Sequence, residues 1–332
     1  MSHRGRWRML DWIVTLDCPA RCFYCFQDRP RHMGSPARIP PNLVESVRTL
    51  GFSRVVVSGG EPLIVAGMLS QILQLLEAGI AVNLLTRDEI PVAAAEKLFS
   101  FPGFTLEQGI DSLSSETAMR IGCPLPSEQY LRLLAGLTRQ GPAKTIVRIV
   151  CVRDNAEDLP STVTRLRECG ISNLVFILPR TAAKTDLATR YLAPDKITAI
   201  SQLAADLLSS GVRVRVETHD IPQQSKRPSA VCNAGRTSLT LFPSGDIGLC
   251  QHLPEIIVGQ IGPVPYIDEE AISPFTSPGL EAFEGTLCND CTEFDRCQES
   301  GRCYASSSRL GALFGPDEYC PFRNRQHGDL HR

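Results

Sequence analysis

Apolar and polar residues alternate in short runs along the first two thirds of the chain, and longer segments with helical spacing lie between these runs. The strand-like runs are residues 11–16, 54–62, 80–86, 104–111, 145–152 and 172–179. The helix-period segments are residues 41–50, 65–79, 91–99, 127–140, 156–169 and 194–210. This alternation predicts an α/β fold with a parallel sheet and right-handed crossovers. The six repeats are too few for a closed (β/α)8 barrel and favour an open, partial barrel.

The pattern changes past residue 212. Residues 212–218 (VRVRVET) predict a strand, and residues 237–250 (TSLTLFPSGDIGLC) predict a hairpin that turns at residues 243–245. The remainder is rich in Pro, Gly, Ser and Cys and has only short helical stretches. We therefore expect a core domain over residues 1–215 and a small cysteine-rich domain over residues 216–332. Because the second domain has little apolar content, we expect metal ligation to supply much of its folding free energy.

Composition excludes several classes of protein. The chain has 332 residues, 43% of them hydrophobic and 21% charged, with a net charge of −2. This balance gives no electrostatic reason to expect nucleic acid or a membrane surface as a partner. No apolar run reaches the roughly 18 residues that span a bilayer, and the N-terminus has no signal peptide pattern. We expect a cytoplasmic protein.

Cysteine is the residue type that carries the candidate chemistry. Ten of the thirteen cysteines fall in two groups, at residues 18–25 and 232–320, and the others are Cys123, Cys151 and Cys169. Disulfides are rare in a reducing compartment, so clustered cysteines there are better explained as ligands of a metal or an iron–sulfur cluster.

The first group is a C-x3-C-x2-C triad, Cys18, Cys22 and Cys25, in a loop that follows the first predicted strand. Three thiolates leave one iron of a [4Fe–4S] cluster open. A structural zinc ion would need a fourth ligand, and the loop offers His32 only at a distance. The spacing favours the cluster and leaves zinc as the alternative. A glycine turn at residues 59–62 ends the second strand at the same edge of the sheet.

Together these two motifs resemble the radical S-adenosylmethionine (SAM) family. The family signature C-x3-C-aromatic-C is matched by Cys18, Cys22, Tyr24 and Cys25, and the second motif, GGEP, by residues 59–62. The resemblance implies a partial (β/α)6 barrel in which the amino and carboxylate groups of SAM bind the open iron. It also implies reductive cleavage of SAM to a 5′-deoxyadenosyl radical that abstracts a hydrogen atom from the substrate.

The same resemblance implies contacts to SAM. The segment Gly59, Gly60, Glu61 and Pro62 would hold the methionyl amine, and the backbone at Tyr24 would meet the adenine. Asp111 and Ser112, after the fourth strand, are candidate ribose or methionyl contacts. Arg120 either pairs with the carboxylate of SAM, which suits a guanidinium, or is a solvated helix arginine.

The second cysteine group resembles the SPASM extension of radical SAM enzymes. Its members are Cys232, Cys250, Cys288, Cys291, Cys297, Cys303 and Cys320. One spacing departs from the family pattern: five residues separate Cys297 from Cys303, where relatives have three residues between the corresponding cysteines. Structural zinc is the alternative for this group.

The SPASM resemblance implies two auxiliary [4Fe–4S] clusters, and so three clusters in the whole chain. The outer one would be held by Cys288, Cys291, Cys297 and Cys320. The inner one would be held by Cys232, Cys250 and Cys303, with its fourth iron open to substrate or bound by His252.

Among the other polar residues, Cys123 is the best candidate for a thiol hydrogen donor, because strand parity turns Cys151 outward and Cys169 lies at a helix end. Arg148 is expected to face the polar lumen, where Glu107 is also a candidate. The loop at residues 179–193 is expected to border the substrate opening.

These inferences predict a radical SAM/SPASM enzyme that modifies a ribosomally made peptide or protein by crosslinking, thioether formation, epimerisation or side-chain oxidation. A reductant such as flavodoxin or ferredoxin would supply electrons. The barrel begins by residue 11, so we expect no N-terminal leader-binding domain. The alternative is a dehydrogenase or epimerase of a sugar or another small natural-product intermediate, and a different class is a non-catalytic metal-binding scaffold.

Overall fold

The computed structural model describes residues 7–25, 39–178, 192–218, 232–317, 320 and 322. The chain forms two compact units, which are described separately: a larger one of residues 12–39 and 53–219, and a smaller one of residues 1–11, 40–52 and 220–332. Most of the loop expected to border the substrate opening, residues 179–191, lies outside the described residues, as does His32. The boundary between a core domain of residues 1–215 and a cysteine-rich domain of residues 216–332 stays a prediction.

The larger unit is built on a sheet whose strands follow one another in chain order. From β2 to β7 each strand pairs in parallel with the next. The six predicted strands are confirmed, and residues 213–218, which the pattern placed after the barrel repeats, form a further strand parallel to β6. The strands are β1 (Met9–Ile13), β2 (Arg54–Ser58), β3 (Ala81–Thr86), β4 (Phe104–Gly109), β5 (Thr145–Val150), β6 (Asn173–Leu178) and β7 (Arg213–Thr218).

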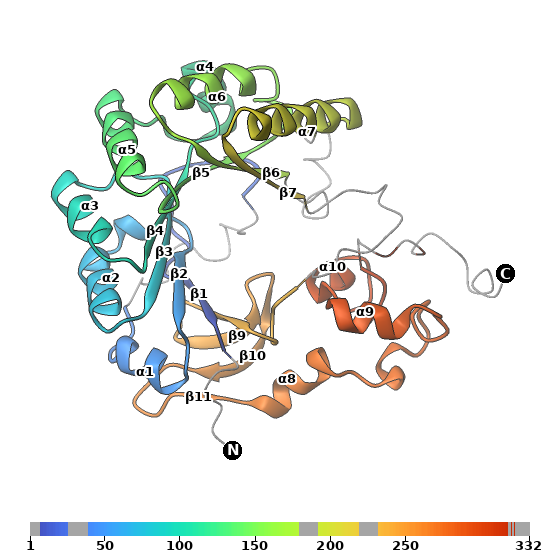
Figure 1. The fold of residues 1–332 in the computed structure, drawn as a ribbon. Helices are drawn as coiled ribbons and strands as arrows, with labels where there is room; N and C mark the ends of the chain where they lie inside the picture. Colours follow the sequence, from blue (N-terminus) through green and yellow to red (C-terminus); the bar gives the residue numbers. More distant parts are fainter. Residues whose placement is uncertain are drawn as a thin grey trace. The chain divides into compact units, whose positions relative to one another are not determined.

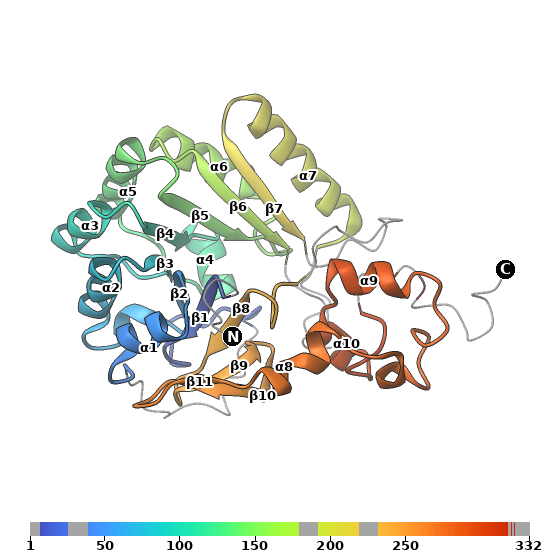
Figure 2. The same cartoon turned by 60° about the horizontal axis from the view of Figure 1, so that its bottom comes forward.

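Helices cover one face of this sheet (Figures 1 and 2). They are α2 (Met68–Glu77), α3 (Val92–Phe99), α5 (Glu128–Gln140), α6 (Leu159–Glu168) and α7 (Pro194–Ser209). The predicted helical segments are thus confirmed, with α1 (Leu43–Thr49) in the smaller unit. The helix α4 (Ser115–Ile121) was not among the predicted helical segments, although the alternative for Arg120 had placed that residue on a helix. No helix in the described ranges is long and apolar enough to cross a membrane.

The two faces of the sheet differ in polarity. Side chains along β3 and β5 alternate between buried and partly exposed positions, and most of the buried ones, such as Leu84 and Val147, are apolar. The opposite face carries charge: Arg148 pairs with Glu107 at 2.6 Å and with Glu217 at 2.9 Å. The prediction that Arg148 and Glu107 share the polar face is therefore confirmed.

One buried amide ties together the ends of β4 and β5. Asn155 is fully buried, and its Nδ2 donates to the carbonyl oxygens of Asp111 at 2.8 Å and Val150 at 2.9 Å. Its Oδ1 accepts from the backbone N–H of Val152 at 2.8 Å. These bonds satisfy backbone groups where the strands end and no ladder partner continues.

We predict that Asn155→Ala lowers the free energy of unfolding by about 1–3 kcal/mol, since it leaves buried backbone groups unsatisfied. Urea denaturation followed by circular dichroism measures the change. Asn173→Ala is the matched control, because Asn173 makes only one exposed bond, to the Pro142 carbonyl at 3.3 Å. Equal losses in the two variants would contradict the structural role of Asn155.

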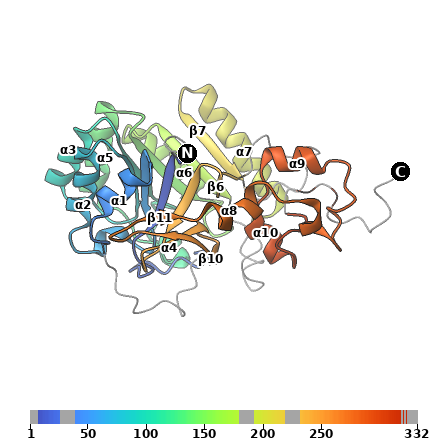
Figure 3. The same ribbon diagram turned by 90° about the horizontal axis from the view of Figure 1, so that it is seen from below.

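The smaller unit contains four antiparallel strands, β8 (Ser238–Leu241), β9 (Asp246–Cys250), β10 (Leu253–Gln260) and β11 (Tyr266–Ile267). The predicted hairpin at residues 237–250 is confirmed as β8 and β9. Three short helices follow: α8 (Glu269–Thr276), α9 (Phe294–Ser300) and α10 (Tyr304–Arg309). Within this unit, α8 lies between the strands and the other two helices (Figure 3).

This unit also has an aromatic core that was not expected from the sequence. Phe314 lies 5.7 Å from Phe275 and Phe283, and 5.6 Å from Tyr304, measured between ring centroids. Phe294 packs edge-on against Phe283 at 5.0 Å. Aromatic side chains bury a large apolar area each. The expectation that this part of the chain lacks apolar content for a core of its own was therefore wrong.

Candidate functional site

The cysteine loop, residues 14–25, follows β1 and is held by the glycine turn after β2. The backbone N–H of Gly60 donates to the Thr15 carbonyl at 2.7 Å, and that of Glu61 to the Asp17 carbonyl at 2.8 Å. A Cβ on Gly60 would lie 1.9 Å from the Asp17 carbonyl oxygen. Without a side chain at Gly60, the backbone of the glycine turn can approach the cysteine loop closely.

A second glycine supports the loop at the end of α4. The N–H of Arg21 donates to the Gly122 carbonyl at 2.7 Å, and the N–H of Phe23 to the Ile121 carbonyl at 3.2 Å. Gly122 has φ of +81°, and a Cβ there would lie 2.5 Å from the Arg21 carbonyl oxygen. The loop is thus fixed on two sides through backbone contacts that larger residues would disrupt.

The triad cysteines pack in a small apolar cluster. Cys18, Cys22 and Cys25 lie against Ala20, Ala118, Ile121 and Val152, together with Cys123. None of these cysteines forms a disulfide. Within the described ranges, no three His, Cys, Asp or Glu side chains are placed to hold a single metal ion. The donor set of three thiols on one fixed loop fits a [4Fe–4S] cluster, which cysteine thiolates hold.

Arg87 is the central charged group beside the cysteine loop. It pairs with Asp111 at 3.0 Å, and its Nη2 donates to the Tyr24 hydroxyl at 2.5 Å. The Tyr24 hydroxyl in turn donates to Asp111. Burial raises the pKa of the Cys22 thiol, and the positive charge of Arg87 opposes that rise. Sequence reasoning missed Arg87; the available signal was a basic residue directly after the third predicted strand, at the edge where the motifs gather.

Glu61 is fully engaged by the chain around it. It is 1% exposed and accepts hydrogen bonds from Thr86 Oγ1 at 2.6 Å, the Arg87 N–H at 2.8 Å and the Leu63 N–H at 3.1 Å. Burial raises its pKa, while these hydrogen bonds act in the opposite direction. In this structure Glu61 anchors the end of β3 to the glycine turn, which Gly59, with φ of +134°, and Pro62 complete. Contacts of this segment to SAM stay a prediction.

Asp111 and Ser112 are both buried after β4. Asp111 Oδ1 accepts from the Val150 N–H at 2.8 Å, and Ser112 Oγ donates to Asp158 Oδ2 at 2.5 Å. Ser112 Oγ also accepts from the N–H of Ser114 at 2.9 Å. These contacts position the loop between β4 and α4, and a role in binding ribose or the methionyl group stays a prediction.

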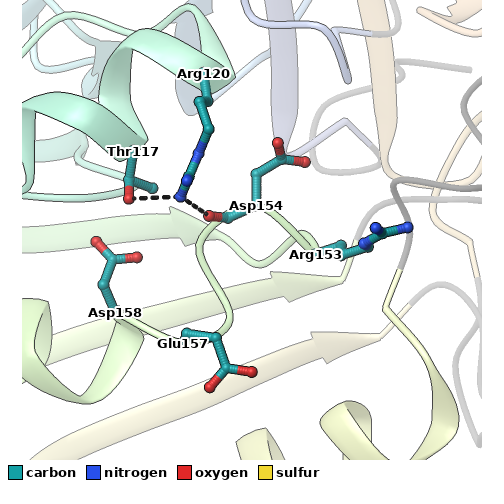
Figure 4. Close-up of a pocket in the computed structure, with 6 residues that line it drawn as sticks. All are labelled: Thr117, Arg120, Arg153, Asp154, Glu157 and Asp158. Atoms are coloured by element: carbon teal, nitrogen blue, oxygen red, sulfur yellow. Dashed lines mark hydrogen bonds between the residues drawn. The ribbon is translucent and has the colours of Figure 1, made fainter.

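Arg120 lies in a polar pocket of about 340 Å³ (Figure 4). Its side chain is 50% exposed, and its Nη2 donates to Thr117 Oγ1 at 3.1 Å and to the Asp154 carbonyl at 3.0 Å. Its Nη1 pairs with Glu116 at 3.2 Å. A half-exposed guanidinium held in place is available to a carboxylate, so both alternatives from the sequence remain. The pocket is lined by Thr117, Arg120, Arg153, Asp154, Glu157 and Asp158.

The remaining cysteines of the larger unit differ in position. Cys123 is 9% exposed beside the triad, and burial raises its pKa to about 12. Cys151 is fully buried, and burial raises its pKa as well. Cys169 is partly exposed after α6. The thiol of Cys123 therefore stays protonated at neutral pH, as a hydrogen donor requires, and that role stays a prediction.

In the smaller unit a buried aspartate links two of the predicted cluster ligands. Asp317 is fully buried; its Oδ2 accepts from the Cys303 N–H at 2.9 Å and its carbonyl from the Cys320 N–H at 3.0 Å. The N–H of Cys291 donates to the Cys288 carbonyl at 3.3 Å. Near the hairpin, the N–H of His252 donates to Cys250 Sγ at 3.4 Å. The assignment of the seven cysteines to two clusters stays a prediction.

Comparison with known proteins finds a family match over part of the chain. Residues 12–166 match the model of the Radical SAM superfamily. A 7-carboxy-7-deazaguanine synthase from Rhodopirellula baltica is 26% identical in an alignment of 198 positions that covers 55% of this chain and 71% of that protein.

Solved structures resemble the chain over almost its whole length. Streptococcus suis SuiB bound to S-adenosylmethionine aligns over 95% of this chain and 77% of its own, with 16% identity and a TM-score of 0.68. Native anSMEcpe with bound AdoMet aligns over 95% and 94%, with 17% identity and a TM-score of 0.64. At this identity the likeness establishes a common fold.

We predict that Gly60→Ala destabilises the protein by about 1–3 kcal/mol, because the added Cβ must displace the backbone of the cysteine loop. The measurement is urea denaturation of the metal-free protein. Gly262→Ala is the control, since a Cβ there meets no atom within 4 Å, and it should change stability by no more than about 0.5 kcal/mol. A Gly60→Ala variant as stable as the control would refute the close approach.

Proposed function

We propose that this radical SAM enzyme, whose radical SAM domain spans residues 12–166, modifies a ribosomally made peptide or protein by abstracting a hydrogen atom. The observation that carries the proposal is the cysteine loop, where three thiols are fixed between two glycine contacts in an apolar environment. When bound, a [4Fe–4S] cluster and SAM would supply reductive cleavage of the sulfonium and hence the radical.

The residues of the chain would have distinct tasks in this reaction. Cys18, Cys22 and Cys25 would hold the cluster, and Arg87 would place positive charge beside it. The alternating sheet would offer its polar face to the substrate, because the other face is buried under helices. Arg120, half-exposed in its pocket, would bind the carboxylate of SAM.

The SPASM assignment and the peptide substrate draw support from the same comparisons. SuiB and anSMEcpe resemble this chain over 95% of its length, so the alignment takes in most of the cysteine-rich residues 232–320. SuiB has been solved bound to its precursor peptide SuiA, and anSMEcpe bound to a Kp18Cys peptide. We infer two auxiliary [4Fe–4S] clusters in this region and a peptide substrate for this chain.

A small-molecule substrate is the second candidate. Its support is the 26% identity to a 7-carboxy-7-deazaguanine synthase. That match covers 55% of this chain, whereas the likeness to SuiB and anSMEcpe covers 95%. The wider coverage favours the peptide.

Iron content and SAM cleavage test the proposed cofactors. After anaerobic reconstitution we expect three [4Fe–4S] clusters, about twelve irons per chain, and formation of 5′-deoxyadenosine from SAM on reduction. Cys22→Ala should lose about four irons and all SAM cleavage, because one triad ligand is missing. Cys169→Ala, outside both groups, is the control and should match the wild type. Zinc in place of iron, without SAM cleavage, would support the scaffold instead.

Deuterium transfer tests the class of substrate. We expect that a short peptide encoded beside this gene, deuterated at Cα and Cβ, transfers deuterium into 5′-deoxyadenosine, as mass spectrometry would detect. The same peptide deuterated only in its aromatic rings is the control and should transfer none. Transfer from a deuterated small metabolite, and none from the peptide, would establish the second candidate.

A further inference from the structure

One arginine of the smaller unit is buried against a predicted cluster ligand. Arg302 is 4% exposed, and its Nη1 donates to Cys288 Sγ at 3.2 Å and to the Gly315 carbonyl at 3.5 Å. The guanidinium carbon lies 4.7 Å from the ring centroid of Phe283 and 5.2 Å from that of Phe294. The guanidinium therefore packs against two aromatic rings and donates a hydrogen bond to a sulfur atom.

No carboxylate among the described residues balances the charge of Arg302. Across the described parts of the chain it forms no ion pair, and its Nε is buried without a hydrogen-bond partner. Burying an unpaired charge is unfavourable, so buried cations normally lie beside an anion. Of the described groups that contact the guanidinium, only the Cys288 sulfur can become anionic. The structure thus fits a negatively charged group at Cys288.

The local sequence explains how Arg302 reaches this position. Gly301 has φ of +75°, and a Cβ on it would lie 2.8 Å from the Cys232 carbonyl oxygen. The chain therefore turns sharply just before Arg302. This turn belongs to the segment between Cys297 and Cys303, the one whose C-x5-C spacing departs from the SPASM pattern.

We propose that Arg302 is a positioning residue: the internal counter-cation of the outer auxiliary cluster, whose N–H···S bond to Cys288 raises the reduction potential of that cluster. The inference rests on the proposed function, which assigns Cys288 to this cluster. Reduction adds negative charge to a cluster, and a nearby cation and a hydrogen bond to sulfur both stabilise that charge. A planar guanidinium also fits between two aromatic rings, as an ammonium does not.

The test is a potentiometric titration of the full chain, followed by electron paramagnetic resonance. Substitution of Cys18, Cys22 and Cys25 by Ala removes the first cluster, so that only the auxiliary clusters, about eight irons, give a signal. In this background Arg302→Gln should retain its iron and shift one of two midpoint potentials to a more negative value, leaving the other in place. Arg296→Gln is the matched control, because it removes the charge of a residue next to Cys297. The side chain of Arg296 is 60% exposed and pairs with Glu293, so both midpoint potentials should stay unchanged.

Arg302→Lys separates charge from packing. Because it keeps the cation, its potential should lie nearer the wild-type value than that of Arg302→Gln. If Arg302→Gln loses its iron but Arg302→Lys retains it, the result supports the role of Arg302 as counter-cation. If both variants lose iron, Arg302 has a packing role and the inference is overturned. Full iron with unmoved potentials in Arg302→Gln overturns this inference alone. A wild-type chain with no more than about four irons overturns the auxiliary clusters and this inference together.

Discussion

Close backbone contact between the cysteine loop and two glycines is the constraint on which the rest of the larger unit's site depends. The loop follows β1 without regular structure of its own, and its carbonyl and N–H groups are satisfied by residues 60–61 and 121–122. At Gly60 and Gly122 a Cβ would come within 1.9 Å and 2.5 Å of carbonyl oxygens of the loop. Strand ends that neighbour in the sheet are thus joined by backbone alone, which leaves the cysteine side chains available as ligands.

Two buried carboxylates of the larger unit each have a cationic partner. Asp111 is paired with Arg87, and Glu107 with Arg148. Such pairs add little net stability, because desolvation offsets much of their attraction. Loss of one partner is nevertheless costly, because the remaining charge is then buried without an opposite charge. Arg87 differs in one respect: its Nη1 is buried with no hydrogen-bond partner among the described residues. It therefore retains donor capacity beside the triad.

Alternation of apolar and polar residues was enough to predict the six barrel strands and most of the helices, because burial of one sheet face imposes a period of two. The cysteine and glycine motifs located the triad because each motif is a short run of neighbouring residues. The features that could not be predicted from the sequence depend on contacts between residues that lie far apart in the chain. Arg87 meets Tyr24 and Asp111 only after folding. The aromatic core of the smaller unit draws on residues 275–314, whose rings are spaced without a period.

The aromatic core changes what the C-terminal cysteines mean. If that unit had no core, metal binding would be explained by the need to fold. With Phe275, Phe283 and Phe314 packed together, folding has another source of free energy, of the kind that aromatic burial supplies. Cys288 and Arg302 are nevertheless buried at its edge, where an apolar pair would pack at lower cost. A thiol beside a cation that pairs with no carboxylate of the described residues suits the proposed auxiliary cluster, to which both groups would contribute in electron transfer.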